Sequence, residues 1–150
     1  MGLEKLDGFL QRHRRVTIDT SVFIYHVQAN PRYLPATDRI FAWLERPSSS
    51  AVTSCISMTE LLAQPIREGD ENRVGEFFAL LTRYPHLEWV PASLQIAALA
   101  ARFRSEHRLR TPDALQAATA VYSSATSLIT NDAAFRRLSE FQVVLLDDVL

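Results

Sequence analysis

Four acidic residues either follow short apolar runs of the chain or begin an alanine-rich one. They are Asp19, Glu60, Asp113 and Asp132. Asp19 comes directly after Val16-Thr17-Ile18, and Asp132 closely follows Ser127-Leu128-Ile129-Thr130. If such acids meet in the fold, their mutual repulsion costs free energy unless a cation lies between them. The pattern therefore favours a site for a metal ion.

The neighbours of these acids indicate which metal. They are side chains with hydroxyl and amide groups: Thr20, Ser21, Thr130 and Asn131. Oxygen ligands without a converging His or Cys suit Mg²⁺ or Mn²⁺ rather than zinc or copper. A hydrated ion held by carboxylates typically acts on phosphate esters, so hydrolysis of a phosphodiester is the predicted chemistry.

Helix capping is the alternative explanation for each acid taken singly. Asp19 and Asp132 have the residue type of an N-cap. Ser57 and Glu60 have the spacing of a capping box, and Thr111-Pro112-Asp113 reads as a capped helix start. Capping does not explain, however, why several apolar strands should direct acids to one edge of a sheet.

Five short runs have the length and composition of strands. They are Val16–Ile18, Ala51–Ile56, Leu87–Val90, Ser127–Thr130 and Val143–Leu146. Between them, apolar residues recur at a helical period, as Ile96, Leu99 and Phe103 do. Strands that alternate with helices predict the α/β class, with a mainly parallel sheet between two helical layers. Ligands of such sheets bind beyond the carboxyl ends of the strands, where these acids stand.

Composition limits the other possibilities. A length of 150 residues fits a single domain over residues 1–150, with a lead segment, residues 1–14, that is expected to be helical. The four glycines and the single lysine, Lys5, cannot form a G-x-G-x-x-G or Walker A loop, and one cysteine excludes an internal disulfide. No signal core or long apolar stretch is present, which predicts a soluble, cytoplasmic protein without a membrane partner.

Taken together, the motifs resemble those of PIN-domain ribonucleases, specifically the VapC-type toxins of bacterial type II toxin–antitoxin (VapBC) pairs. The matching segments, in order, are Ile18–Tyr25, Ser57–Leu62, Leu109–Ala118 and Leu128–Asp132. The resemblance implies a three-layer α/β/α PIN-like fold with a parallel sheet of order 3-2-1-4-5. It also implies a homodimer and a VapB-like antitoxin that occupies the active-site groove.

The same resemblance implies an activity and a set of roles. A water molecule activated by Mg²⁺ or Mn²⁺ would cleave RNA and leave a 5′-phosphate and a 3′-hydroxyl. Asp19 and Asp113 would be the main metal ligands, and Asp132 and Glu60 would complete the acidic site. Thr130 would place its hydroxyl close to the ion. Many relatives carry a further acid at the position of Ala134, so its absence leaves the choice between one and two ions open.

Four arginines close to Asp113 in sequence are candidate RNA contacts: Arg102, Arg104, Arg108 and Arg110. Arginine binds phosphate through two parallel hydrogen bonds, which would suit a rim beside the metal. The alternative is the solvated face of a helix that buries Phe103. The formal net charge of −1 gives no sign of a polyanionic partner, because nucleic-acid binders usually carry a basic excess.

Two other functions remain as alternatives. A catalytically weak or inactive PIN-like protein could serve as a scaffold or an RNA-binding module, and Ala134 is the feature that supports it. A phosphoacceptor domain or aspartate-based phosphatase also places acids after strands. That class needs a lysine late in the sequence or a D-x-D start, whereas this chain has Ser21 two residues after Asp19 and its lysine at position 5.

Overall fold

The structure is a computed structural model that describes residues 2–150. Within that range, the strands are β1 (Val16–Ile18), β2 (Ala51–Ser54), β3 (Leu87–Val90), β4 (Ser127–Thr130) and β5 (Gln142–Leu145). The α-helices are α1 (Gly2–Arg12), α2 (Thr20–Val27), α3 (Leu34–Leu44), α4 (Ile56–Arg67), α5 (Glu71–Thr82), α6 (Leu94–His107) and α7 (Thr111–Tyr122). Two 3₁₀ helices, η1 (Ala133–Arg137) and η2 (Leu146–Val149), flank β5.

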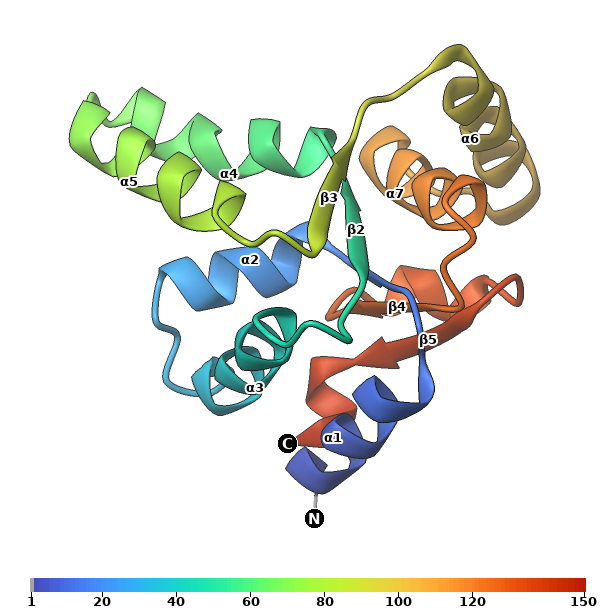
Figure 1. Ribbon diagram of the computed structural model, residues 1–150. Helices are drawn as coiled ribbons and strands as arrows, with labels where there is room; N and C mark the ends of the chain where they lie inside the picture. Colours follow the sequence, from blue (N-terminus) through green and yellow to red (C-terminus); the bar gives the residue numbers. More distant parts are fainter. Residues whose placement is uncertain (1) are drawn as a thin grey trace.

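The five strands form one parallel sheet in the order β3-β2-β1-β4-β5. The predicted three-layer α/β/α class and its strand order are therefore confirmed. β1 lies at the centre, where the register pairs Ile18 with Ile129 of β4. Every residue of β1, β2 and β4 is buried, as expected for strands with a helical layer on each side (Figure 1).

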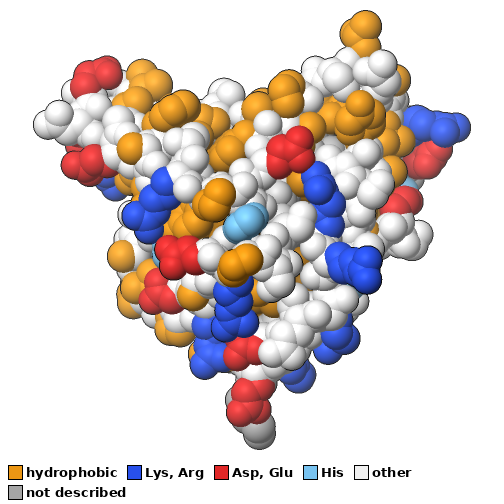
Figure 2. Space-filling model, viewed as in Figure 1, with side chains coloured by type: hydrophobic (Ala, Val, Ile, Leu, Met, Phe, Trp, Pro, Cys, Tyr) orange, Lys and Arg blue, Asp and Glu red, His pale blue; other side chains and the backbone are white. Residues whose placement is uncertain are grey.

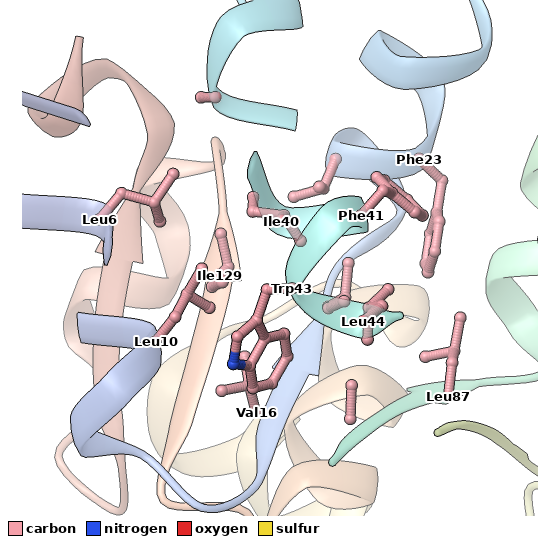
Figure 3. Close-up of a cluster of buried hydrophobic side chains, with 14 of the residues drawn as sticks. Leu6, Leu10, Val16, Phe23, Ile40, Phe41, Trp43, Leu44, Leu87 and Ile129 are labelled. Atoms are coloured by element: carbon pink, nitrogen blue, oxygen red, sulfur yellow. The ribbon is translucent and has the colours of Figure 1, made fainter. Parts of the chain in front are cut away.

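Side chains alternate between the two faces of the sheet and form two hydrophobic cores. On one face, α1, α2 and α3 pack over Val16, Ile18 and Ile129. Figure 3 shows how Leu10 and Trp43, from two different helices, meet over this face. On the other face, α6 and α7 cover Val52 and Leu128. The alanines of α7 are fully buried there, and their small side chains let this helix pack closely on the sheet.

Within the lead segment, a helix runs from Gly2 to Arg12, as predicted, whereas His13 and Arg14 follow it without helical structure; Met1 lies outside the described residues. α1 buries Leu6, Phe9 and Leu10 and lies beside the C-terminal η2 (Figure 1). Fully burying one such side chain stabilises a fold by about 1.5–3 kcal/mol, so α1 is an integral part of the core. Gly2 is required at this contact, because a Cβ atom there would lie 2.3 Å from the carbonyl oxygen of Val149.

Two predicted strand boundaries were wrong. The second strand ends at Ser54 rather than Ile56, because the backbone of Cys55 is already helical, with φ −57° and ψ −20°, and α4 begins directly after it. The last strand runs from Gln142 to Leu145 instead of Val143 to Leu146, because Leu146 opens η2. In both cases, helical backbone begins at a residue that was predicted to belong to the strand. No helix within residues 2–150 is long and apolar enough to cross a membrane.

Candidate active site

Asp19 leaves the carboxyl end of the central strand and is buried, with 7% of its surface exposed. It stands at the N-cap position of α2, yet its side chain makes no capping hydrogen bond, so capping is not the role of this acid. Its Oδ2 instead accepts hydrogen bonds from the hydroxyls of Thr130 (2.7 Å) and Ser21 (3.2 Å). Nε2 of Gln116 lies 3.5 Å from the other carboxylate oxygen.

Burial raises the pKa of Asp19 above its ordinary value of 3.8. Hydrogen bonds from Thr130, the backbone of Thr20, Gln116 and Ser21 act in the opposite direction and stabilise the charged form. The carboxylate is therefore oriented by its neighbours but poorly hydrated, and a bound cation would relieve the cost of its charge.

Asp113 stands in the first turn of α7 and is also buried. Burial is the main cause that raises its pKa, and the charges of Asp132 and Asp19 raise it further, while Arg110 lowers it. Asp19 and Asp132 are thus both close enough to Asp113 for their charges to act on it. The predicted cap at Thr111 is wrong, because Arg110 is the N-cap residue and Thr111 is already helical.

Asp132 follows β4 and caps η1, with Oδ1 accepting a 2.9 Å hydrogen bond from the backbone N–H of Ala134. The capping alternative is therefore confirmed for this acid. Its own backbone N–H donates to Oγ1 of Thr130 at 3.0 Å. The hydroxyl of Thr130 thus connects Asp132 to Asp19, which places the two carboxylates at the same edge of the sheet. Ala134 contributes no oxygen from its side chain.

Glu60 lies on the exposed side of α4, and its Oε1 accepts a 2.8 Å hydrogen bond from Oγ1 of Thr20. The predicted capping box is wrong, because α4 begins at Ile56 and Ser57 is inside the helix. The hydroxyl of Ser57 instead lies 2.8 Å from that of Thr20. Glu60 is therefore joined to the first acidic motif through Thr20.

Asn131 lies between the acids and the end of the chain. Its backbone N–H donates to Ser21, and its side-chain amide donates to the hydroxyls of Tyr25 (3.3 Å) and Tyr33 (3.1 Å). These two tyrosine rings are stacked, with centroids 4.0 Å apart. Its Oδ1 accepts from the backbone N–H of Asp147. The side chain of Asn131 thus holds the surrounding loops together rather than facing the carboxylates.

The candidate arginines do not form one patch. Arg110 is largely exposed, and its Nε lies 3.4 Å from Oδ2 of Asp113. Arg104 and Arg108 line an open hollow of about 470 Å³ near the end of α6, and Arg102 is not among the residues that line it. At 100° per residue, Arg102 and Arg104 point about 160° apart on this helix. Basic side chains are likewise spread over the face in Figure 2.

The donor set fits a hard divalent ion, because Asp19, Asp113 and Asp132 offer only oxygen and the first two are buried. Arg110 is the cationic side chain beside Asp113, and it is largely exposed. Across residues 2–150, however, no three His, Cys, Asp or Glu side chains are already grouped tightly enough to hold a metal ion. Ligation of one ion by all three acids together would therefore require their side chains to move closer together.

Gln116 is the site residue that the sequence analysis missed. Its side chain is 1% exposed, within hydrogen-bonding distance of Ser57 (2.9 Å) and 3.5 Å from Asp19. It lies three residues after Asp113, one helical turn away, so the two side chains share a face of α7. A long polar side chain on an otherwise alanine-lined buried face was the available signal.

Comparison with known proteins identifies the family. The sequence pattern of the PIN domain matches residues 16–141, which is most of the chain and excludes α1. No curated protein matches the sequence.

Among solved structures, the chain is similar to VapBC2 from Rickettsia felis bound to a DNA fragment from their promoter, at 18% identity and a TM-score of 0.70, covering 87% of this chain and 98% of that one. It is similar to VapBC-1 from nontypeable Haemophilus influenzae at 20% identity and a TM-score of 0.66, with 89% and 98% covered. A toxin–antitoxin complex from Klebsiella pneumoniae matches at 23% identity and a TM-score of 0.63, with 87% and 97% covered. These similarities concern the fold, and the sequence match establishes that the chain belongs to the PIN-domain family.

Proposed function

We propose that the protein is a metal-dependent endoribonuclease, the toxin of a toxin–antitoxin pair. The observation that carries this proposal is the arrangement of Asp19, Asp113 and Asp132. Two of these carboxylates are buried, and the charges of Asp19 and Asp132 both act on Asp113. PIN domains are generally nucleases, and the similar structures include VapBC toxin–antitoxin complexes.

In this proposal, Asp19 and Asp113 would hold Mg²⁺ or Mn²⁺, with Asp132 and Glu60 completing the site. When bound, the ion supplies a more acidic water and offsets the negative charge of the phosphodiester. Thr130 and Ser21 fix the orientation of the Asp19 carboxylate through their hydroxyls. Thr20 does the same for Glu60. The four acids would therefore act as oriented ligands rather than as nucleophiles.

Arginine side chains would bind the RNA backbone. Arg110 is suited to this role because its side chain is 76% exposed and its guanidinium already lies next to Asp113. Arg104 and Arg108, in their hollow on α6, would contact phosphates farther along the strand, and Arg102 would contact them from another side of that helix. Phosphate contacts of this kind set affinity and position more than sequence preference.

A groove beside Glu60 is the proposed position of the antitoxin. Apolar residues from three helices line it, among them Ile24 of α2, Leu61 of α4 and Phe77 of α5. An apolar segment of a VapB-like partner would cover such a groove and block access to Glu60. A homodimer, which the resemblance implies, and a cytoplasmic location, which the sequence predicts, belong to the same proposal.

The test is cleavage of a mixed RNA substrate with Mn²⁺ by the wild type and by Asp19→Asn. We expect the wild type to cleave, and both Asp19→Asn and an excess of chelator to abolish cleavage. Asp148→Asn is the matched control, because Asp148 is an exposed acid that pairs with Arg136. Full activity of Asp19→Asn, or full activity in chelator, would refute the proposal.

An inactive PIN-like RNA-binding protein is the second candidate. Two observations favour it: Ala134 stands where many relatives have an acid, and the described part of the chain holds no ready group of three metal-binding side chains. Calorimetric titration with Mn²⁺ separates the two candidates. A nuclease should bind the ion in a manner that Asp19→Asn removes, whereas an inactive relative should show no binding that depends on Asp19.

A further inference from the structure

A chain of buried polar side chains connects Asp19 and Glu60 through the interior of the protein. Gln116 on α7 is at its centre, with Ser57 of α4 and Thr20 of α2 on the path to Glu60. Gln116, Ser57 and Thr20 are all buried, with exposures of 1%, 0% and 6%. Burying a polar group costs free energy unless the group is hydrogen-bonded, so the fold tolerates these three buried polar side chains because they pair with one another.

The direction of every hydrogen bond in the chain is determined by its two ends. The backbone N–H of Ser54, at the end of β2, can only donate, so the Gln116 atom 2.8 Å from it is the carbonyl oxygen. The side-chain amide nitrogen of Gln116 must then point the other way, toward Oγ of Ser57 at 2.9 Å. Gln116 therefore donates to Ser57.

The second half of the chain follows from the carboxylate. Oε1 of Glu60 only accepts when ionised, so Thr20 donates to it at 2.8 Å. Oγ1 of Thr20 is then free to accept from Ser57, whose hydroxyl lies 2.8 Å away. The hydrogen bonds thus run in one direction, from the backbone N–H of Ser54 through Gln116, Ser57 and Thr20 to Glu60.

Thr53 does not interrupt this path. Its hydroxyl donates to the carbonyl oxygen of Ile18 at 2.7 Å, so it has no proton left for Ser57, which lies 3.2 Å away. The shorter contact, from Ser57 to Thr20, is therefore the one that continues the chain. The side-chain amide nitrogen of Gln116 also lies 3.5 Å from Oδ1 of Asp19. The side chain of Gln116 therefore faces Asp19 directly and is connected to Glu60 through the hydroxyls of Ser57 and Thr20.

We propose that Gln116 is a positioning residue of the active site, which orients Asp19 directly and Glu60 through Ser57 and Thr20. This inference rests on the proposed nuclease function. It gives Gln116 a role that neither its place in the helix nor its burial would require. An apolar residue of the same length would fill the space but would leave Ser57 without its donor and Asp19 without its amide neighbour.

The test compares three substitutions by calorimetric titration with Mn²⁺ and by RNA cleavage. Gln116→Met keeps the length of the side chain, and Ser57→Ala and Thr20→Val break the path to Glu60 alone. We expect each to weaken Mn²⁺ binding, with Gln116→Met in the range of about 10- to 100-fold that is typical of residues supporting metal ligands. We expect kcat to fall while KM for RNA stays close to the wild-type value. Thr20→Ser retains the hydroxyl and should restore binding.

A matched control separates positioning from general stability. Thr119 is a buried residue of the same helix whose hydroxyl donates to the carbonyl oxygen of Leu115, away from the acids. Thr119→Val should lower the unfolding midpoint and leave Mn²⁺ affinity unchanged. If Gln116→Met does not fold, Ser57→Ala and Thr20→Val carry the test.

The outcomes distinguish this inference from the proposal on which it rests. A wild type that binds no Mn²⁺ and cleaves no RNA would overturn both. A wild type that does both, together with folded variants whose Mn²⁺ affinity and kcat equal the wild-type values, would overturn only the role of Gln116. Weaker binding in Thr119→Val as well would also overturn it, because the effect would then reflect stability.

Discussion

Oγ1 of Thr130 donates a 2.7 Å hydrogen bond to Oδ2 of Asp19, although 111 positions separate the two residues in sequence. The parallel pairing of β1 and β4 brings them together, because the register that pairs Ile18 with Ile129 leaves Asp19 and Thr130 as the next residues of the two strands. The same hydroxyl accepts from the backbone N–H of Asp132. One side chain at the end of β4 therefore sets the position of two acids.

Replacement of Thr130 with Val should lower both stability and activity. The substitution preserves the shape of the side chain but removes the donor to a buried carboxylate. We expect the free energy of unfolding to fall by about 1–3 kcal/mol, the usual cost of leaving a buried group unpaired. RNA cleavage should fall by about 10- to 100-fold. Urea unfolding and a cleavage assay measure the two effects, and unchanged cleavage by a folded Thr130→Val variant would contradict this role.

Removal of the charge of Asp113 should stabilise the protein in the absence of divalent ions. Burial and the charges of Asp132 and Asp19 raise the pKa of this carboxyl above 3.8, so its ionised form is disfavoured in the folded state. Above pH 3.8 the folded protein then retains more protons than the unfolded chain, and the contribution of this group to stability falls as pH rises through its folded pKa.

We therefore expect Asp113→Asn in chelator to melt above the wild type at pH 7 and to lose this advantage as the pH is lowered below 4. Asp113→Asn should not cleave RNA at pH 7 or below pH 4. Thermal melts across this pH range provide the measurement. A variant that is less stable than the wild type at pH 7 would show that Arg110 compensates the charge of Asp113 fully.

The sequence predicted the sheet well, and it placed the candidate acids at one edge of that sheet from the same local patterns. Short β-branched runs indicate strands, and an acid after each parallel strand must reach the same edge. The capping box at Ser57 failed for an equally local reason, since the helical backbone of Cys55 moves the start of α4 upstream. Gln116 was missed because its partners Ser57 and Asp19 lie 59 and 97 positions away. Only the packing of α7 on the sheet brings them together.

His26 should make the fold sensitive to mild acid. Its ring stacks on Phe41 with centroids 4.0 Å apart, and its Nδ1 lies 3.1 Å from Oγ1 of Thr37. Burial lowers its pKa below 6.5, the nearby Asp38 opposes this effect, and Arg83 adds to it. Between its folded pKa and 6.5, the unfolded chain binds more protons than the folded protein, so stability decreases as the pH falls through this window.

The comparison of wild type with His26→Gln tests this contribution. Urea unfolding at pH 7.5 and at pH 5.5 measures how much stability each protein loses when the pH is lowered. This loss should be larger for the wild type than for the variant. At pH 7.5 the variant itself should be the less stable of the two, because it loses the stacking on Phe41. Equal losses of stability in both proteins would place the acid sensitivity elsewhere.

Arg110 should contribute to RNA binding through a single phosphate contact. Its guanidinium is exposed beside Asp113, at the edge of the proposed metal site. In an Asp19→Asn background, which prevents cleavage, Arg110→Gln should weaken RNA binding and reduce the slope of log affinity against log salt concentration by about 1. Arg67, in the last turn of α4, provides the matched control, and Arg67→Gln should leave the slope unchanged. An unchanged slope in Arg110→Gln would mean that this arginine serves only as the ion-pair partner of Asp113.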